Sequence, residues 1–187
     1  MIICPFTDTL RTLSAASRDL LLARGRAVTV PKEEWLLREG EVARSIFYIE
    51  SGLVRSVRVE DGRDINLDFS LEGEFVTHLR SLRSHTGANY GLQALEPTTL
   101  VELSAAALRE MYSRSPEIES FGRQIVEGLL MRQETHAHLF RLSSPAKRYR
   151  YIAESNAALL QRVSLTNLAS YLGISRETLS RIRGAGR

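Results

Sequence analysis

The sequence predicts an α+β protein of 187 residues in which a small β unit comes first and helices follow. Between residues 27 and 103, short segments rich in β-branched and aromatic residues alternate with turn signals, a spacing typical of antiparallel sandwiches and rolls. After Ser104, apolar residues recur every three to four positions, as they do on amphipathic helices. Residues 163–183 then combine two short helical patterns with a tight turn, which predicts a helix-turn-helix.

The β unit is expected to follow a short helix at residues 14–24, with Ser14 as its N-cap and Gly25 at its end. Asp61-Gly62 is the strongest hairpin signal, because both residues tolerate positive φ. The expected strands are AVTV, WLL, SIFYI, LVRSVRV, INLDFS and TTLVEL.

Two helices are expected between the β unit and the helix-turn-helix, at residues 104–113 and from Pro116 to about Leu142. The longer one carries an apolar repeat, which predicts either a dimer seam or packing on the chain's own roll. The repeat comprises Ile118, Phe121, Ile125, Leu129, Arg132, His136 and Phe140, widened by Val126, Leu130 and Leu139. Ser143-Ser144-Pro145 marks a break, and one further helix is expected at residues 145–161, with Ser144 as N-cap and Pro145 at N1.

The predicted helix-turn-helix starts at Ser164, whose hydroxyl can accept the first free N–H groups of a helix. Gly173 stands where that helix must end, and Ser175 is placed to cap the next one. The second helix directs Leu179 and Ile182 to one side. Its other side carries Arg176, Glu177, Ser180 and Arg181. Arginine suits guanine and glutamate can accept from cytosine, so this face fits base reading; the alternative is a solvated amphipathic helix.

Charge is distributed unevenly along the chain. The net charge is +3, yet residues 141–187 carry nine basic and two acidic side chains, a net charge of +7, and residues 1–140 carry −4. A basic C-terminal part on a mildly acidic body predicts contact with a phosphate backbone.

Several kinds of site are not expected. Cys4 is the single cysteine, so neither an internal disulfide nor a multi-cysteine metal site can form. The four histidines lack metal-ligand spacing, and neither a phosphate loop nor a nucleophile elbow is present. A cupin-like metalloenzyme is the enzyme alternative, but the His-x-His pattern is missing. The sequence thus predicts no enzyme, no cofactor and no metal, and, without a signal sequence or a long apolar run, a cytoplasmic protein that is not in a membrane.

With these elements in order, the chain resembles the Crp–Fnr superfamily of bacterial transcription regulators. The resemblance spans nearly the whole sequence, and it rests on Arg38-Glu39-Gly40-Glu41, Phe47-Tyr48-Ile49, Ser51-Gly52, Gly73-Glu74-Phe75 and the run from Gly173 to Arg181. It implies a cyclic-nucleotide-binding-like jelly roll (a double-stranded β-helix), a long dimerisation helix and an all-α helix-turn-helix domain. The implied domain bounds are 1–115, 116–142 and 143–187.

The resemblance also indicates where this chain departs from its family. The branch that binds cyclic AMP has a Gly-Glu pair and an Arg-Ser pair where this chain reads Thr77-His78 and Ala88-Asn89. The side chains for the ribose and the phosphate are therefore missing, and cyclic AMP is not expected as the ligand. The loop in the family's ligand position contains His78, Arg80, Arg83, His85, Asn89 and Tyr90. Its basic side chains are expected either to bind an unknown small anionic effector or to form only a solvated loop.

The sequence printed here stops shortly after Arg181, so the β-hairpin wing of the family is expected to be missing. Affinity for the DNA backbone would then depend more on Lys147, Arg148, Arg150 and Arg183. The complete set expected to bind DNA is Arg176, Glu177, Ser180, Arg181, Arg183, Ser164 and Lys147.

The resulting hypothesis is a sequence-specific DNA-binding transcription regulator that acts as a homodimer on palindromic double-stranded sites. The dimer would form through residues 116–142, and the resemblance adds RNA polymerase as a partner. The alternative is a ligand-binding roll whose truncated helix-turn-helix makes only protein contacts.

Overall fold

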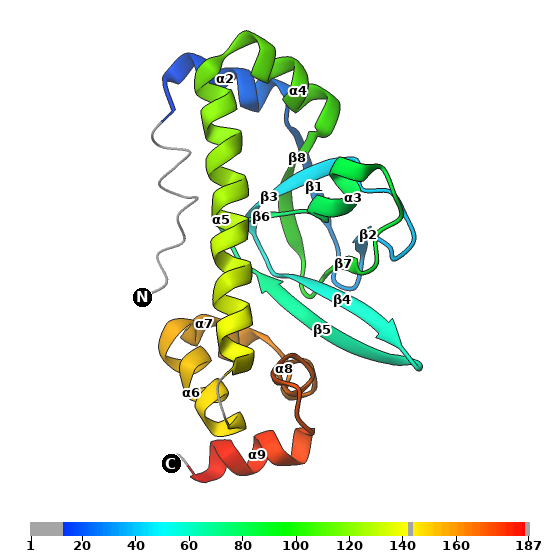
Figure 1. Cartoon of the computed structure of the whole chain (residues 1–187), viewed down its shortest axis with the longest axis vertical. Coiled ribbons are helices and arrows are strands. Elements are labelled where there is room, and N and C mark those ends of the chain that lie inside the picture. The colour runs from blue at the N-terminus through cyan, green and yellow to red at the C-terminus, as the bar shows by residue number, and fades with distance from the viewer. Residues whose placement is uncertain (1–12, 142–143, 186–187) are drawn as a thin grey trace.

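The computed structural model describes residues 13–141 and 144–185. A β-roll lies beside one long helix, and short helices gather at the far end of that helix (Figure 1). The strands are β1 (Arg26–Val30), β2 (Trp35–Leu37), β3 (Ser45–Ser51), β4 (Val54–Glu60), β5 (Arg63–Ser70), β6 (Phe75–Val76), β7 (Gly91–Ala94) and β8 (Thr98–Ser104). The helices are α2 (Ala15–Arg24), α3 (Leu79–Ser84), α4 (Ala105–Arg114), α5 (Pro116–Arg141), α6 (Pro145–Ser155), α7 (Ala157–Arg162), α8 (Leu165–Leu172) and α9 (Arg176–Ala185).

The roll consists of two four-stranded antiparallel sheets, in the orders β1-β8-β3-β6 and β2-β7-β4-β5. Six strands coincide with the predicted segments, which confirms the α+β class and the roll. Strands β6 and β7 were missed, because β6 has only two residues and β7 is buried throughout, so its sequence does not alternate.

The β4–β5 hairpin turns at Asp61-Gly62, as predicted. Both residues have positive φ, 51° and 72°, as a type I′ turn requires. Glu60 therefore pairs directly with Arg63, and the two strands run on together to Val54 and Ser70. This hairpin is the part of the roll that reaches toward the C-terminal helices (Figure 1).

Helix predictions are confirmed for α2, where Ser14 accepts from the Ser17 N–H, and for α4 and α5. The single helix predicted at residues 145–161 is wrong. The chain breaks at Asn156, whose side chain accepts from the Leu159 N–H and so starts α7 as a separate helix. The other predicted cap of this region, Ser144, does bond the Lys147 N–H at 3.3 Å, whereas Ser143 and Leu142 lie outside the described residues.

Helix α5 divides its apolar residues between two surroundings. Ile118, Phe121 and Ile125 are buried against α2, α4 and the roll. For this part of α5 the alternative prediction therefore holds: the apolar repeat packs within the chain and is not available as a dimer seam. This packing removes their apolar surface from water without the need for a second subunit. Val126, Leu130 and Met131 remain exposed.

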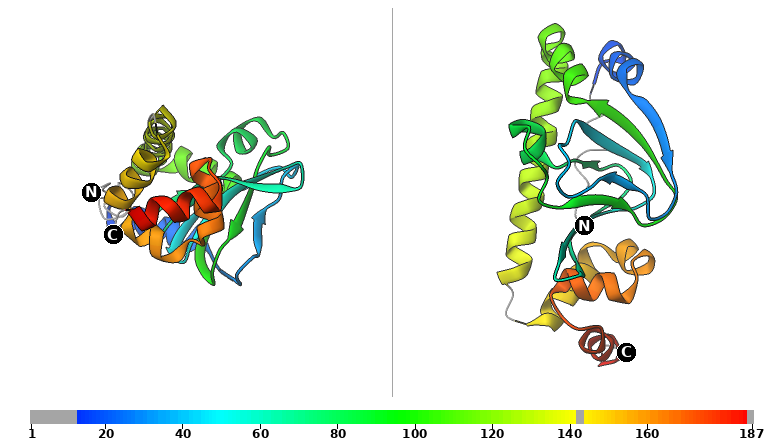
Figure 2. Two further views of the ribbon diagram at one scale, coloured as in Figure 1. Left: turned by 90° about the horizontal axis from the view of Figure 1, so that it is seen from below. Right: turned by 90° about the vertical axis from the view of Figure 1, so that its right-hand side faces the viewer.

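The C-terminal helices share a core with the roll. Leu53 and Phe69 from the roll and Leu139 from α5 pack with the buried side chains of α6 to α9. Figure 2 accordingly shows these helices lying directly below the sheets and beside the end of α5.

Candidate nucleic-acid interface

The turn between α8 and α9 has the geometry of a helix-turn-helix. Ser164 accepts from the Asn167 N–H at 3.1 Å and so starts α8. Gly173 ends that helix with a φ of 66°, in the left-handed region that disfavours a Cβ. The Ile174 N–H bonds the Ala169 carbonyl at 3.0 Å and the Gly173 N–H bonds that of Ser170, which is a Schellman motif. Ser175 then caps α9 by accepting from the Thr178 N–H.

Helix α9 turns one side inward and the other to solvent. Leu179 is completely buried among α8 and its neighbours, and Ile182 is half-buried. The residues expected to bind DNA on this helix are all exposed: Arg176, Glu177, Ser180, Arg181 and Arg183. Ser164 and Lys147, from the starts of α8 and α6, are exposed as well. The structure thus brings one outward-facing set together on α9, with Ser164 serving also as an N-cap.

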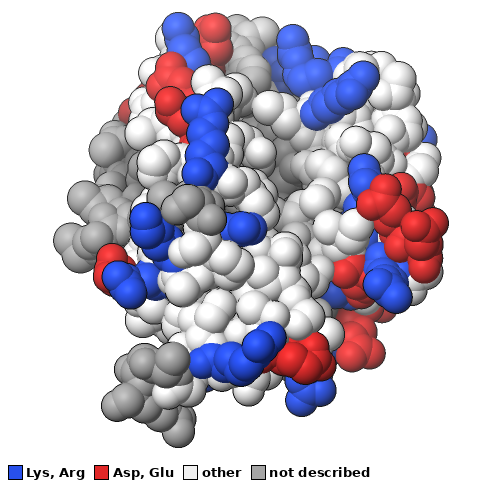
Figure 3. Space-filling model, turned by 60° about the horizontal axis from the view of Figure 1, so that its bottom comes forward, with Lys and Arg blue, Asp and Glu red and all other residues white. Residues whose placement is uncertain are grey.

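The charges of this face are available to a partner. Within residues 13–141 and 144–185, the arginines of α9 form no ion pair with a carboxylate. Glu177 lies in the first turn, where backbone and Ser175 hydrogen bonds lower the pKa of its carboxyl group, so it is ionised and can accept hydrogen bonds. Figure 3 shows Lys and Arg side chains on a mostly uncharged surface at this end of the molecule.

Arg148, which the sequence grouped with the phosphate contacts, has a structural role. Its Nη1 donates to the Leu172 carbonyl at 2.7 Å, at the C-terminus of α8, and its guanidinium lies 5.7 Å from the centre of the Phe140 ring. A cation there satisfies a carbonyl that the helix itself leaves unpaired. Arg150, two residues further on, is exposed.

The first helix of the motif is bound to the roll, which the sequence did not reveal. The Ser170 hydroxyl accepts from the Asn66 N–H at 3.0 Å and donates to the Asp64 carbonyl at 2.8 Å, both in β5. The Asn66 side chain in turn donates to the Asn167 carbonyl at 3.3 Å. Helix α8 is therefore held against strand β5 of the hairpin by these hydrogen bonds.

Two arginines add ion pairs between the helices and the roll. Arg162, at the end of α7, bonds Glu72 at 2.7 Å and also pairs with Glu96. This contact lowers the pKa of Glu72 to about 2. Arg132 of α5 donates to Asp68 at 2.8 Å and pairs with Glu74.

The predicted effector loop separates into an inner and an outer group. His78 is buried and caps α3 by accepting from the Ser81 N–H at its Nδ1, and its Nε2 lies 2.8 Å from Oδ1 of Asn89. The Tyr90 ring lies 4.1 Å from the His78 ring. The outer group points to solvent and consists of Arg80, Arg83 and His85.

Ala88 occupies the position where the resemblance would require an arginine. It is buried, and its N–H and carbonyl are bonded to Glu41 and Gly40 at 2.8 Å each. Neither a side-chain donor nor a free backbone N–H at this residue remains for an anion.

Among the described residues, no group of three or more His, Cys, Asp or Glu side chains is arranged to hold a metal ion. Cys4 lies outside the described residues. No helix in the described ranges is long and apolar enough to cross a bilayer.

The roll matches the cyclic nucleotide-binding domain family over residues 27–115. Over most of its length the chain is similar to two curated proteins. It is 27% identical to the regulatory protein HlyX of Actinobacillus pleuropneumoniae, covering 85% of this chain and 70% of HlyX. It is also 27% identical to the transcriptional activator protein anr of Pseudomonas aeruginosa, covering 89% of this chain and 71% of anr.

Among solved structures, FixK2 from Bradyrhizobium japonicum has a similar fold. The TM-score is 0.71 at 21% identity, over 86% of this chain and 83% of FixK2. The similarity therefore extends through the roll, the long helix and the C-terminal helices together.

Proposed function

Because this chain is a Crp–Fnr-type protein with a cyclic nucleotide-binding-like roll, we propose that it is a sequence-specific DNA-binding transcription regulator acting as a homodimer. In this proposal residues 1–115 sense an effector, residues 116–142 join two subunits and residues 143–187 bind DNA. The protein would act in the cytoplasm, alongside RNA polymerase, and would not be an enzyme.

The observation that carries the proposal is the outward face of α9. Three exposed arginines and an ionised Glu177 lie on a helix whose opposite side is fixed by buried Leu179. Arginine can bond guanine O6 and N7 in a bidentate manner, and glutamate can accept from cytosine N4. Arg176, Glu177, Ser180 and Arg181 would therefore contact bases, and Arg183, Ser164 and Lys147 would contact the phosphate backbone.

A dimer is supported by the exposed apolar side of α5. Val126, Leu130 and Met131 are 44%, 69% and 63% exposed, and they lie within two turns of one helix. Pairing this side with a second copy would remove it from water and present two copies of α9 to one palindromic site. The two helices would then be roughly 34 Å apart, the distance between successive major grooves.

Cyclic AMP is not the ligand in this proposal, because Ala88 offers no donor and His78 is bonded to Ser81 and Asn89. Any effector of the predicted loop would have to use the exposed Arg80, Arg83 and His85, together with Tyr90 and Asn89.

Selection from a random double-stranded DNA pool, followed by binding measurements at several salt concentrations, tests the proposal. We expect a two-fold symmetric site with half-site centres about 10–11 base pairs apart. Log affinity should fall linearly with log salt, because phosphate contacts release counterions. Failure to enrich any sequence would favour the alternative, a roll whose C-terminal helices contact only proteins.

Dimerisation is tested with Leu130→Arg, which places a charge on the exposed side of α5. We expect a monomer in analytical ultracentrifugation and loss of binding to the palindromic site. Leu22→Arg is the matched control, because Leu22 is 59% exposed on a different helix, α2. A Leu130→Arg variant that remains dimeric would contradict the assigned interface.

A further inference from the structure

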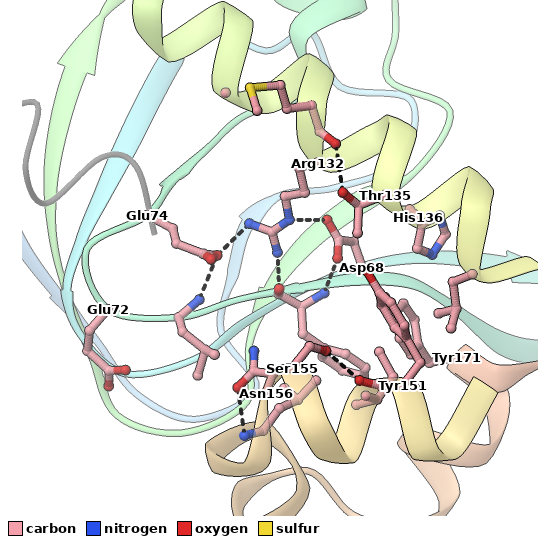
Figure 4. Close-up of a pocket in the computed structure, with 17 residues that line it drawn as sticks. Asp68, Glu72, Glu74, Arg132, Thr135, His136, Tyr151, Ser155, Asn156 and Tyr171 are labelled. Atoms are coloured by element: carbon pink, nitrogen blue, oxygen red, sulfur yellow. Dashed lines mark hydrogen bonds and ion pairs between the residues drawn. The ribbon is translucent and has the colours of Figure 1, made fainter. Parts of the chain in front are cut away.

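A cavity of about 330 Å³ lies where the roll, α5 and the C-terminal helices meet (Figure 4). Its volume falls within the range of about 300–1,000 Å³ that is usual for small-molecule sites. It is separate from the predicted effector loop, because none of the loop residues from His78 to Tyr90 lines it.

Aromatic and apolar side chains form about half of its wall. Tyr171 of α8 stands between Phe69 and His136, with ring centres 5.2 and 5.3 Å away. Tyr151 of α6 and Leu139 of α5 complete this side. A flat apolar molecule would lie against several rings at once, which favours aromatic ligands.

One polar atom in the same wall lacks a partner among the described residues. Nε2 of His136 is buried and forms no hydrogen bond within the described part of the chain. A buried polar atom without a partner costs free energy, so a ligand that bonds it gains an interaction that the protein alone does not make. Burial lowers the pKa of His136 and raises that of Tyr171, so the first ring is neutral and the second keeps its hydroxyl proton.

The charged groups of the wall disfavour an anion. Three carboxylates line the cavity, from Asp68, Glu72 and Glu74, against the guanidinium of Arg132. That guanidinium already donates to Asp68, to Glu74 and to the Phe69 carbonyl, as Figure 4 shows. Two carboxylates already balance its charge and three of its five N–H donors are bonded, so a negatively charged ligand would meet an excess of carboxylates.

We infer that this cavity is a binding site for a small aromatic molecule that is positively charged or neutral. The carboxylates are ion-paired, Asp68 and Glu74 with Arg132 and Glu72 with Arg162, but together with Glu96 they outnumber these two guanidiniums, and this excess of negative charge would attract a cationic group. The rings of Tyr151 and Tyr171 would contact the flat body of the ligand, and His136 would bond a polar atom.

Because of the position of the cavity, a bound ligand would contact the elements that hold α9, the helix proposed to contact DNA bases. Phe69 and Glu72 belong to the roll, Leu139 to α5, and Tyr171 to the helix that precedes α9. A molecule that separates or tightens these walls would shift α8, and with it α9. This consequence for DNA depends on the proposed function, whereas binding itself does not.

Calorimetry on the full chain tests the inference with three probes that share one ring system: tryptamine, indole and indole-3-acetate. We expect saturable binding of tryptamine, weaker binding of indole and no binding of indole-3-acetate. Equal affinity for the anion, or no saturable binding of tryptamine and indole, would overturn the inference.

Two variants locate the site. Ser155→Phe, which fills the cavity from α6, should weaken tryptamine binding by about tenfold or more, a change of about 1.4 kcal/mol. Ala158→Phe is its control, since Ala158 is exposed and does not line the cavity. His136→Phe keeps the ring and removes the nitrogen, so we expect binding about fivefold weaker, and a retained affinity would remove this nitrogen from the site. Unchanged affinity in both Ser155→Phe and His136→Phe would refute this location.

DNA binding is then measured with and without tryptamine. A change in affinity for the selected site supports coupling through α8. If tryptamine binds in the cavity but no DNA site exists, the inference stands and the proposed function fails.

Discussion

Helices α8 and α9 are neighbours of similar length, yet they use their polar side chains in opposite ways. On α8, Ser170 and Asn167 are bonded to β5 of the roll. On α9, Ser180 and the arginines are exposed to solvent. The comparison indicates that α8 anchors the motif to the roll, whereas the polar groups of α9 remain available to a partner.

The turn between α8 and α9 couples the anchored helix to the exposed one. Gly173 and the Schellman bonds fix the angle between the helices, and Arg148 secures the last carbonyl of α8. Any displacement of α8 relative to the roll is therefore passed to α9 as a movement of the whole motif.

The largest expected effect comes from truncating a buried side chain of α8, the helix that is bonded to the roll. Leu172 is completely buried in the cluster shared by the roll and α8, so Leu172→Ala should lower the free energy of unfolding by about 2–5 kcal/mol. Urea unfolding followed by circular dichroism measures this change. Leu22→Ala, at an exposed site, is the control; similar losses in both variants would show that α8 is not specially anchored.

The next effect concerns recognition. Arg181→Ala should reduce discrimination at one base pair by about 1–3 kcal/mol, because a bidentate contact is lost. Arg183→Ala should instead weaken binding to all sequences and lower the salt slope by about one. Competition between the selected site and single-base variants measures both, and unchanged discrimination in Arg181→Ala would remove that residue from base reading.

A serine pair tests the comparison directly. Ser170→Ala removes the acceptor of the Asn66 N–H and the donor to the Asp64 carbonyl, so stability should fall by about 0.5–1.5 kcal/mol. Ser180→Ala removes an exposed hydroxyl and should leave stability unchanged. Thermal unfolding of both variants measures these changes. Equal shifts in Tm would contradict the distinction between the two helices.

The smallest effect is the pH dependence of the Arg162 contact. Because Arg162 lowers the pKa of Glu72 to about 2, the contact stabilises the fold above the usual carboxyl pKa and is lost as pH falls toward 2. Glu72 is 42% exposed, so the contribution should not exceed about 1 kcal/mol after solvent screening. Unfolding of Glu72→Gln and the native chain should differ at pH 6 and converge near pH 2; a constant difference would exclude this linkage.

Local patterns were sufficient for much of the fold. Asp61-Gly62 predicted the hairpin because both residues tolerate positive φ, and Gly173 predicted the end of α8 for the same reason. Ser164 and Ser175 predicted the starts of α8 and α9 because a serine hydroxyl can accept a free N–H of the first turn. By contrast, Asn156 divided a predicted helix, because its side chain competes with the backbone for the Leu159 N–H.

The sequence by itself determined the order of roll, long helix and reader, and the outward face of α9, since periodicity and capping act over a few residues. Only the tertiary structure decided which apolar side of α5 is buried, that Arg148 bonds Leu172, and that Ser170 holds β5. The hydrogen bonds of Arg148 and Ser170 join residues 24 to 106 positions apart, and no local pattern of side chains encodes which distant backbone group a polar atom will meet.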